Sequence, residues 1–240
     1  MGVMHTIGLV GGMSWHSTAS YYRVVNEVVA ARLGGHHSAS MVLRSLDFAE
    51  VRRLQESGDW AGAGDLLARA ARDCVAGGAD LVAICTNLMH KVAPAVEAAV
   101  DVPLLHIGDA VARAAADHGW DRLGVLGTRW VMEEPFYAER LAPHGITAIT
   151  PGADARALVD RVVFDELTQG LIRDESRAAY VAVIERLAEQ GAQAVVLACT
   201  EIGLLVRPED SPLPLICSAE AHARALADFA LADQPVASPA

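Results

Sequence analysis

Short apolar runs alternate with longer amphipathic stretches along almost the whole chain. In the amphipathic stretches, apolar residues recur every three to four positions, which is typical of helices. Residues 17–35 begin with Ser-Thr and end with Gly-Gly, and residues 176–192 follow a similar pattern. The predicted strands are residues 5–10, 40–46, 80–85, 102–107, 122–127, 145–150, 194–199 and 213–217. This alternation predicts an α/β fold, in which parallel sheets are flanked by helices.

Composition limits the partners that the chain can have. With 240 residues, 52% of them hydrophobic, and a mean hydropathy of +0.28, the chain can bury a sizeable core. The net charge of −11 opposes binding to nucleic acid or to anionic membrane surfaces. No apolar run approaches the roughly 20 residues of a membrane span. The four cysteines lie in apolar surroundings without a C-x-x-C pair, which favours reduced thiols. We therefore expect a cytoplasmic protein.

The chain repeats itself at a coarse level. The stretch "TIGLVGGMS" near the start resembles "RLGVLGTRW" further on, and each is followed by a strand entered through Gly-Ala, at Gly78 and Gly191. A proline-led strand follows in both halves. The three correspondences predict two pseudo-symmetric lobes, residues 1–105 with 215–240 and residues 106–214. Chance similarity among Val- and Leu-rich strands is the competing interpretation.

The repeat separates two Cys-Thr dipeptides that look alike. Counted from Gly78 and Gly191, Cys85 corresponds to Ala198, and Thr86 corresponds to Cys199. Because successive side chains of a strand point to opposite faces, a shift of one residue changes the side. We therefore expect Cys85 in the core and Thr86 in the position that corresponds to Cys199.

Four motifs in this order, "GLVGGMSWHST", "CTNLMHK", "LGTRWVM" and "CTEIGLLV", resemble the aspartate/glutamate racemase family, closest to a bacterial amino-acid racemase subgroup with a GGMSW motif. The resemblance implies a cofactor-independent racemase of acidic amino acids, which is usually a homodimer and has its active site in the cleft between two lobes. In this family one thiolate removes the α-proton and a thiol on the opposite face returns one. A thiol suits this chemistry because modest tuning brings its pKa close to neutral pH.

The sequence departs from the family at the first thiol. The cysteine of the family's first motif aligns with Thr86, whereas the second catalytic cysteine is retained as Cys199. The resemblance implies that Cys199 acts on the L-enantiomer, of aspartate or glutamate. The proton returned from the side of Thr86 would come from a bound water or a weakly acidic hydroxyl. We therefore expect slow or direction-biased racemisation.

The resemblance also indicates residues that bind the substrate. Asn87 and Thr200 resemble the family's ligands for the α-carboxylate. Met13, Ser14 and Thr128 lie in the loops after the two glycine-containing strands, where the family holds the rest of the substrate.

Several residues have a second interpretation. Arg44 could bind the side-chain carboxylate of the substrate, or it could form a structural salt bridge. Thr86 and Asn87 could simply cap the helix that follows them. His90 is predicted to be a helix-surface or capping residue rather than a proton shuttle. His36 has a histidine neighbour but no partner at metal-ligand spacing, so no metal site is expected.

Other functions fit the sequence less well. The glycines of "GLVGGMS" do not have the spacing of a dinucleotide-binding loop. Lys91 is the only lysine that could form a Schiff base with pyridoxal phosphate. A decarboxylase or isomerase of a small diacid from the same superfamily remains an alternative, because such an enzyme can use a single thiol. A weak or inactive protein that binds acidic amino acids is the non-enzymatic alternative.

Overall fold

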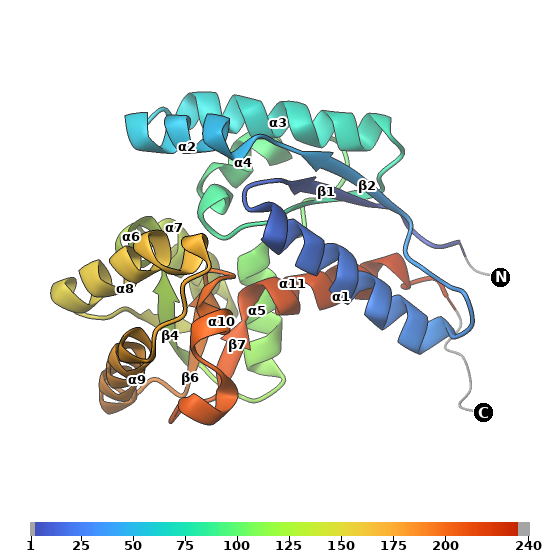
Figure 1. Ribbon diagram of the computed structural model, residues 1–240. Coiled ribbons are helices and arrows are strands. Elements are labelled where there is room, and N and C mark those ends of the chain that lie inside the picture. Colours follow the sequence, from blue (N-terminus) through green and yellow to red (C-terminus); the bar gives the residue numbers. More distant parts are fainter. Residues whose placement is uncertain (1–2, 235–240) are drawn as a thin grey trace. The chain divides into compact units, whose positions relative to one another are not determined.

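The computed structural model describes residues 3–234, which divide into two units (Figure 1). The first unit comprises the residues up to Ile107 together with those from His222 onward, and the second comprises Gly108–Ala221. Each unit is built on a parallel sheet that is flanked by helices. The predicted α/β class with two such lobes is therefore confirmed.

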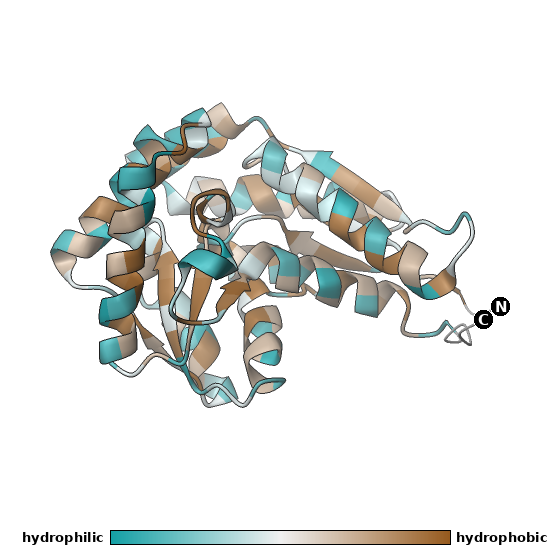
Figure 2. Ribbon diagram, turned by 60° about the horizontal axis from the view of Figure 1, so that its bottom comes forward, coloured by the Kyte–Doolittle hydropathy of each residue, from teal (hydrophilic) through white to brown (hydrophobic). Residues whose placement is uncertain are grey.

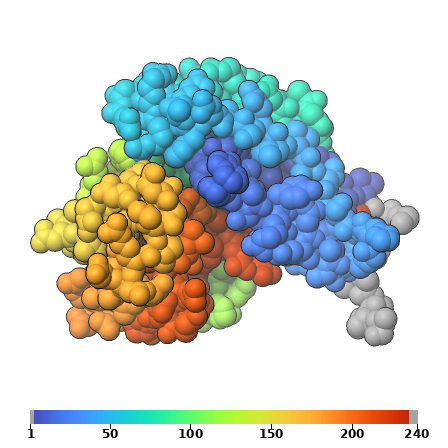
Figure 3. Space-filling model, viewed as in Figure 1, coloured from blue at the N-terminus to red at the C-terminus, as the bar shows by residue number. Residues whose placement is uncertain are grey.

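The first unit has a three-stranded parallel sheet in the order β2-β1-β3. The strands are β1 (Ile7–Gly11), β2 (Met41–Ser45) and β3 (Leu81–Ile84). Its helical segments are α1 (Trp15–Leu33), α2 (Phe48–Ser57), α3 (Trp60–Ala76), η1 (Leu88–Val92), α4 (Ala93–Glu97) and α11 (Ser218–Ala230). The boundary with the second unit falls within the first turn of α11, between Ala221 and His222. Helices α2 and α3 pack against each other, and the light-blue to teal atoms of this part of the chain adjoin in the space-filling view (Figure 3).

Helix α1 begins earlier than the sequence pattern predicts. The pattern places the start at Ser17, but the helix begins at Trp15 because Ser14 is its N-cap, with its side chain accepting a hydrogen bond from the Ser17 N–H. The predicted glycine stop is correct, because Gly34 follows the helix with a φ of 68°. Helix α1 therefore begins directly after the loop that carries the glycine motif, and a residue of that loop caps it.

Residues 102–107 do not form the predicted strand. Leu104 makes a single parallel bridge to Val82, and the backbone then enters α5 (Ile107–Ala116). Two hydrogen bonds make this bridge: the Val82 N–H donates to the Pro103 carbonyl, and the Leu105 N–H donates to the Val82 carbonyl. Because Pro103 has no N–H to donate, it shortens the ladder on one side.

The second unit has a four-stranded parallel sheet in the order β5-β4-β6-β7. The strands are β4 (Arg122–Gly127), β5 (Thr147–Ile149), β6 (Ala194–Ala198) and β7 (Leu215–Cys217). The helical segments that follow α5 are α6 (Arg129–Glu133), α7 (Phe136–Leu141), η2 (Ala142–His144), α8 (Ala153–Asp165), η3 (Leu167–Gln169), α9 (Asp174–Glu189), α10 (Ile202–Leu205) and η4 (Pro208–Asp210).

The boundary between the two units near the C-terminus differs from the predicted one because of strand β7. We expected residues 215–240 to join the first lobe, but β7 pairs with β6, with Val195 opposite Leu215. Residues 215–221 therefore lie in the second unit, and the chain returns to the first unit at His222. The reason is that a short strand is stable only where it completes a sheet, and β6 has an open edge here.

Apolar side chains supply the interior of each unit. The strands are drawn mostly in brown, the hydrophobic colour, whereas the helices alternate between brown and teal (Figure 2). In the second unit, Leu126, Tyr180 and Leu187 are buried in one cluster with side chains of α8, α9 and β6. No helix within residues 3–234 combines the length and the apolar character that crossing a membrane requires.

Two glycines of each central strand show that the units correspond. A Cβ atom on Gly8 would lie 2.9 Å from Cys74 of α3, and one on Gly124 would lie 3.0 Å from Leu187 of α9. On the opposite face, Gly11 lies against α1 and Gly127 against α6 in the same way. Glycine is required where a helix approaches a strand this closely. The strand and the helices on both its faces therefore recur in the same arrangement, as the sequence repeat predicts.

Candidate active site

The loop after β1 holds two of the predicted substrate-binding residues. Gly12 has a φ of 85°, and a Cβ atom there would lie only 2.2 Å from the Leu46 carbonyl oxygen, so the loop requires glycine. Its N–H donates to Thr18 Oγ1 over 2.9 Å, which ties the loop to α1. Met13 is buried, and Ser14 uses its hydroxyl to cap α1. Ser14 thus has a structural role in addition to the predicted one.

The end of β3 holds Cys85, Thr86 and Asn87. Cys85 is 1% exposed, and burial raises the pKa of its thiol. Its N–H donates to the Val10 carbonyl over 3.0 Å, which continues the contact between β1 and β3. Thr86 is the first partly exposed residue after this strand, and Asn87 is buried beside it. Asn87 precedes η1 without capping it through its side chain, so the capping interpretation does not account for this residue.

In the second unit, Thr128 follows β4 directly. It precedes α6, but its side chain makes no capping hydrogen bond. Its hydroxyl oxygen is shielded from solvent and has no hydrogen-bond partner among the described residues. A buried hydroxyl without a partner costs free energy, roughly 1–3 kcal/mol, unless a ligand or water satisfies it. Thr128 therefore has the property expected of a ligand-binding residue.

The end of β6 holds Cys199, Thr200 and Glu201. The Cys199 thiol donates to the Glu201 carboxylate over 3.1 Å, and the Thr200 hydroxyl donates to the same oxygen over 2.7 Å. Cys199 is partly exposed, in contrast to Cys85. Burial of the sulfur raises the pKa of the Cys199 thiol well above its usual value, and the negative charge of Glu201 raises it further. The resting thiol is therefore protonated at neutral pH.

The ladder register gives an independent test of the predicted correspondence between Thr86 and Cys199. Gly8 of β1 pairs with Val82 of β3, and Gly124 of β4 pairs with Val195 of β6. Four residues beyond Val82 is Thr86, and four beyond Val195 is Cys199. The two residues thus occupy equivalent positions at the ends of equivalent strands.

Each unit therefore gathers part of the predicted set at the carboxyl ends of its neighbouring strands. The first unit holds Met13, Ser14, Thr86 and Asn87, and the second holds Thr128, Cys199 and Thr200. These ends are where open parallel sheets usually bind ligands.

Arg44 has a partner outside this set. Its Nε donates to Asp73 of α3 over 2.9 Å, which agrees with the structural salt bridge rather than with a substrate ligand. Both side chains are about half exposed, so the pair adds little stability. Among residues 3–234, no three His, Cys, Asp or Glu side chains are grouped closely enough to hold a metal ion.

Glu201 is a functional candidate that the sequence analysis missed. The signal was present in the sequence, because Glu201 is the third residue of the "CTE" stretch that contains Cys199. Sequence alone does not show whether a side chain two residues away turns back toward the thiol. The distance of 3.1 Å between the two side chains shows that it does.

These features define an α/β enzyme of two similar units, in which polar and thiol-bearing turns follow the central strands. A sequence profile of the Asp/Glu/hydantoin racemase family matches residues 10–226. The chain belongs to this family, and it is an amino-acid racemase, an isomerase. The family predicted from the four motifs is thereby confirmed.

Solved structures agree with this assignment. A proposed Asp/Glu racemase from Yersinia pestis is 48% identical, with a TM-score of 0.91 over 95% of this chain and 100% of that one. An aspartate racemase homologue from Pyrococcus horikoshii OT3 is 29% identical, with a TM-score of 0.83 over 95% of this chain and 99% of that one. A glutamate racemase from Francisella tularensis, in complex with D-glutamate, is 12% identical and shares the fold, with a TM-score of 0.66 over 96% of this chain and 82% of that one.

Proposed function

We propose that this racemase acts on aspartate or glutamate with a bias toward the L-enantiomer, that Cys199 is its catalytic base, and that Thr86 stands in the place of the second thiol. The observation that carries the proposal is the equivalence of these two residues in the ladder register of their sheets. Only one of the two equivalent positions has a thiol, so the two directions of the reaction cannot be chemically alike.

The first step is the loss of the thiol proton. Glu201 accepts a hydrogen bond from Cys199, and it is therefore placed to take that proton and leave a thiolate. The thiolate removes the α-proton of the L-substrate, and the electron pair of the C–H bond stays on the substrate as a carbanion. A raised pKa makes the thiolate scarce but a stronger base once it has formed.

The second step returns a proton to the opposite face of the carbanion. On the side of Thr86, this proton comes from the hydroxyl or from a water molecule, and a hydroxyl is a far weaker acid than a thiol. The return is therefore slow compared with recapture of the proton that Cys199 holds. This difference is the origin of the proposed bias.

Binding of the substrate is assigned to residues that flank these two positions. Asn87 and Thr200 are proposed ligands of the α-carboxylate, and Met13, Ser14 and Thr128 are proposed to hold the rest of the substrate. The unsatisfied hydroxyl of Thr128 supports its inclusion. A homodimer, a cytoplasmic location and independence from cofactors stay predictions of the sequence analysis.

The test is solvent deuterium exchange. The protein is incubated with L-aspartate or L-glutamate in D2O, and loss of the α-proton is measured together with formation of the D-isomer. Cys199→Ala should abolish exchange, and retained exchange would refute the assignment of the base. Cys85→Ala is the matched control, because Cys85 is a buried thiol one residue out of register, and it should leave exchange nearly unchanged.

The same assay distinguishes the alternatives. Exchange without D-product indicates an enzyme that handles protons on one face only, as a decarboxylase of a small diacid would. Binding without exchange indicates a protein that holds acidic amino acids without turning them over. Either outcome would refute the racemisation proposed here.

A further inference from the structure

A cluster of buried histidine side chains and one tyrosine, Tyr21, lies in the first unit, four residues beyond Thr86 at its nearest member. His90 is 2% exposed, His106 is 5% exposed and His222 is fully buried. The ring centroids of His90 and His106 are 4.3 Å apart, and those of His90 and His222 are 5.8 Å apart. The sequence analysis expected His90 to be a surface or capping residue, and its burial excludes the surface position.

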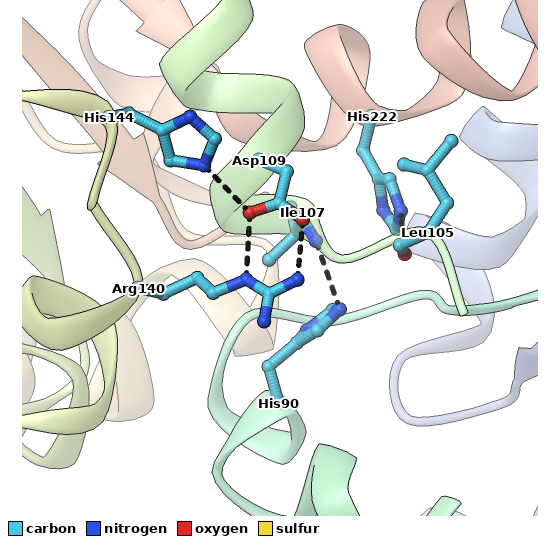
Figure 4. Close-up of polar contacts among 7 residues, drawn as sticks. All are labelled: His90, Leu105, Ile107, Asp109, Arg140, His144 and His222. Atoms are coloured by element: carbon cyan, nitrogen blue, oxygen red, sulfur yellow. Dashed lines mark hydrogen bonds and ion pairs between the residues drawn. The ribbon is translucent and has the colours of Figure 1, made fainter. Parts of the chain in front are cut away.

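Both ring nitrogens of His90 have a backbone partner. The N–H of Ile107 points at His90 Nε2 over 3.2 Å, so Nε2 is the unprotonated acceptor (Figure 4). His90 Nδ1 must then carry the proton, and it donates to the Thr86 carbonyl oxygen over 2.7 Å. The ring is therefore neutral and held in one tautomer, with Thr86 at one end and Ile107 at the other.

The neighbours of His90 favour the same neutral state. Burial lowers the pKa of His90 well below its usual value, and the nearby rings of His106 and His222 lower it further. His222 Nε2 donates to the Leu105 carbonyl over 2.8 Å, and its Nδ1 accepts from the Tyr21 hydroxyl over 2.8 Å. No carboxylate is among these contacts, so a charged His90 would have no compensating partner in them.

The backbone of η1 does not bond the Thr86 carbonyl, and the His90 side chain does so in its place. The N–H of His90 donates to the Asn87 carbonyl over 3.1 Å, in the pattern of a 3-10 turn, and does not reach the carbonyl of Thr86. The imidazole of the same residue bonds that carbonyl instead. His90 therefore fixes the orientation of the peptide unit that carries Thr86.

The second unit shows that this bond is particular to Thr86. At the position equivalent to His90 it has Gly203, which has no side chain, and the carbonyl of Cys199 accepts the Ile202 N–H over 3.2 Å. The carbonyl of Cys199 is thus bonded by a backbone N–H, where that of Thr86 is bonded by an imidazole. This imidazole is the side chain of His90, which also accepts a hydrogen bond from Ile107. Ile107 is the last residue of the first unit before the chain enters the second.

We propose that His90 is a positioning residue for proton return on the side of Thr86, acting through its hydrogen bond to the Thr86 carbonyl. This inference rests on the proposed function, because it assigns Thr86 to that face of the substrate. A hydroxyl or an ordered water is a poor proton donor, and its rate depends strongly on its placement. A fixed Thr86 peptide therefore matters more here than it would for a thiol.

Two conservative substitutions separate the two ends of the ring. In His90→Asn, the amide nitrogen can replace Nδ1 and keep the bond to Thr86, whereas the acceptor for Ile107 is lost. In His90→Gln, the longer side chain can reach Ile107 with its oxygen, whereas the bond to Thr86 is lost. Tyr21→Phe is the matched control, because it removes a hydrogen bond of the same cluster that does not involve Thr86.

The measurement is the partition of the carbanion with L-aspartate and L-glutamate in D2O. The ratio of D-isomer formation to deuterium uptake by the L-isomer reports proton return from the side of Thr86, independently of how much enzyme is folded. His90→Gln should lower this ratio by roughly tenfold, whereas His90→Asn and Tyr21→Phe should leave it within about twofold. Deuterium uptake by the L-isomer should persist in every variant, because Cys199 alone is responsible for it.

Equal ratios in His90→Gln and the wild-type protein would overturn the positioning role while leaving the proposed function intact. No deuterium uptake in the wild-type protein would overturn the proposed function and this role with it. Nitrogen-15 NMR of the wild-type protein gives a second test that does not depend on the variants folding. It should show His90 protonated at Nδ1 alone at neutral pH, and a proton on Nε2 would contradict the inference.

Discussion

Replacement of Glu201 by Gln should change the reactivity of Cys199 and its catalytic rate in opposite directions. The carboxylate accepts hydrogen bonds from the thiol over 3.1 Å and from the Thr200 hydroxyl over 2.7 Å. Its negative charge disfavours the thiolate, and it contributes to the raised pKa of Cys199 after burial, which is the larger cause. Gln has nearly the same shape and no charge. The substitution therefore isolates the effect of the charge.

The size of the effect follows from the distance. Two unit charges about 3 Å apart repel by about 5 kcal/mol at an effective dielectric constant of ~20. Neighbouring charges usually shift a pKa by about one to three units. We expect the pKa of Cys199 to fall in Glu201→Gln, because the neighbouring negative charge is lost, and to stay raised by burial. For each pH unit by which the pKa of a thiol falls, the thiolate becomes about tenfold more abundant but less nucleophilic. The net gain in the rate of alkylation is about three- to fourfold.

The assay is alkylation with iodoacetamide over a series of pH values, followed by mass spectrometry of the Cys199 peptide. Near neutral pH, Glu201→Gln should be alkylated several-fold faster than the wild-type protein, because more of the thiol is ionised. Deuterium exchange into L-aspartate or L-glutamate should instead become slower, by roughly 10²-fold, because the acceptor for the thiol proton is lost. Glu209→Gln is the control, because the side chain of Glu209 is 67% exposed and pairs with Arg207.

Slower or unchanged alkylation in Glu201→Gln would refute the electrostatic argument. Faster exchange would refute the role of Glu201 as proton acceptor. Cys85 serves as an internal reference, because its buried thiol should stay unmodified in all variants while the protein is folded.

Two further predictions concern the ends of β3 and β1. Thr86→Cys restores a thiol and should raise deuterium exchange into D-aspartate or D-glutamate by roughly 10²-fold in the same D2O assay; an unchanged rate would contradict the assignment of Thr86. Gly12→Ala should lower the free energy of unfolding, measured by urea denaturation, by roughly 3 kcal/mol, because its Cβ would clash with Leu46 at a φ of 85°. Gly58→Ala, at a φ of 69° with no atom within 4 Å, should lose only about 1 kcal/mol, and equal losses would contradict the argument.

Much of the fold was predictable because strands and helices have local sequence signals. The Gly-Ala entries at Gly78 and Gly191 allowed the residues of two distant strands to be counted against one another, and the observed ladders have the same register. The weakest prediction was the strand at residues 102–107, which forms only one bridge. Its apolar composition fitted a strand, but composition does not show how many ladder hydrogen bonds a neighbour can supply.

Side-chain partners were much harder to predict than backbone elements. The sequence left Arg44 between a substrate ligand and a salt bridge, and the structure pairs it with Asp73, which lies 29 residues away. His90 was expected to cap or to lie on the surface, and instead it is buried between Thr86 and Ile107. Contacts of this kind depend on which segments pack together, and no local pattern records that.

The sequence by itself determined the α/β class, the repeat, the family motifs and the replacement of a catalytic thiol by Thr86, because each of these depends on residue types and their spacing. The tertiary structure alone decided that Glu201 turns toward Cys199, and that the His90 ring is held in the tautomer that donates to the Thr86 carbonyl. The physical reason is that protonation and tautomeric states depend on burial and on the atoms within hydrogen-bond distance. Those atoms are brought together by the packing of the chain and not by its order.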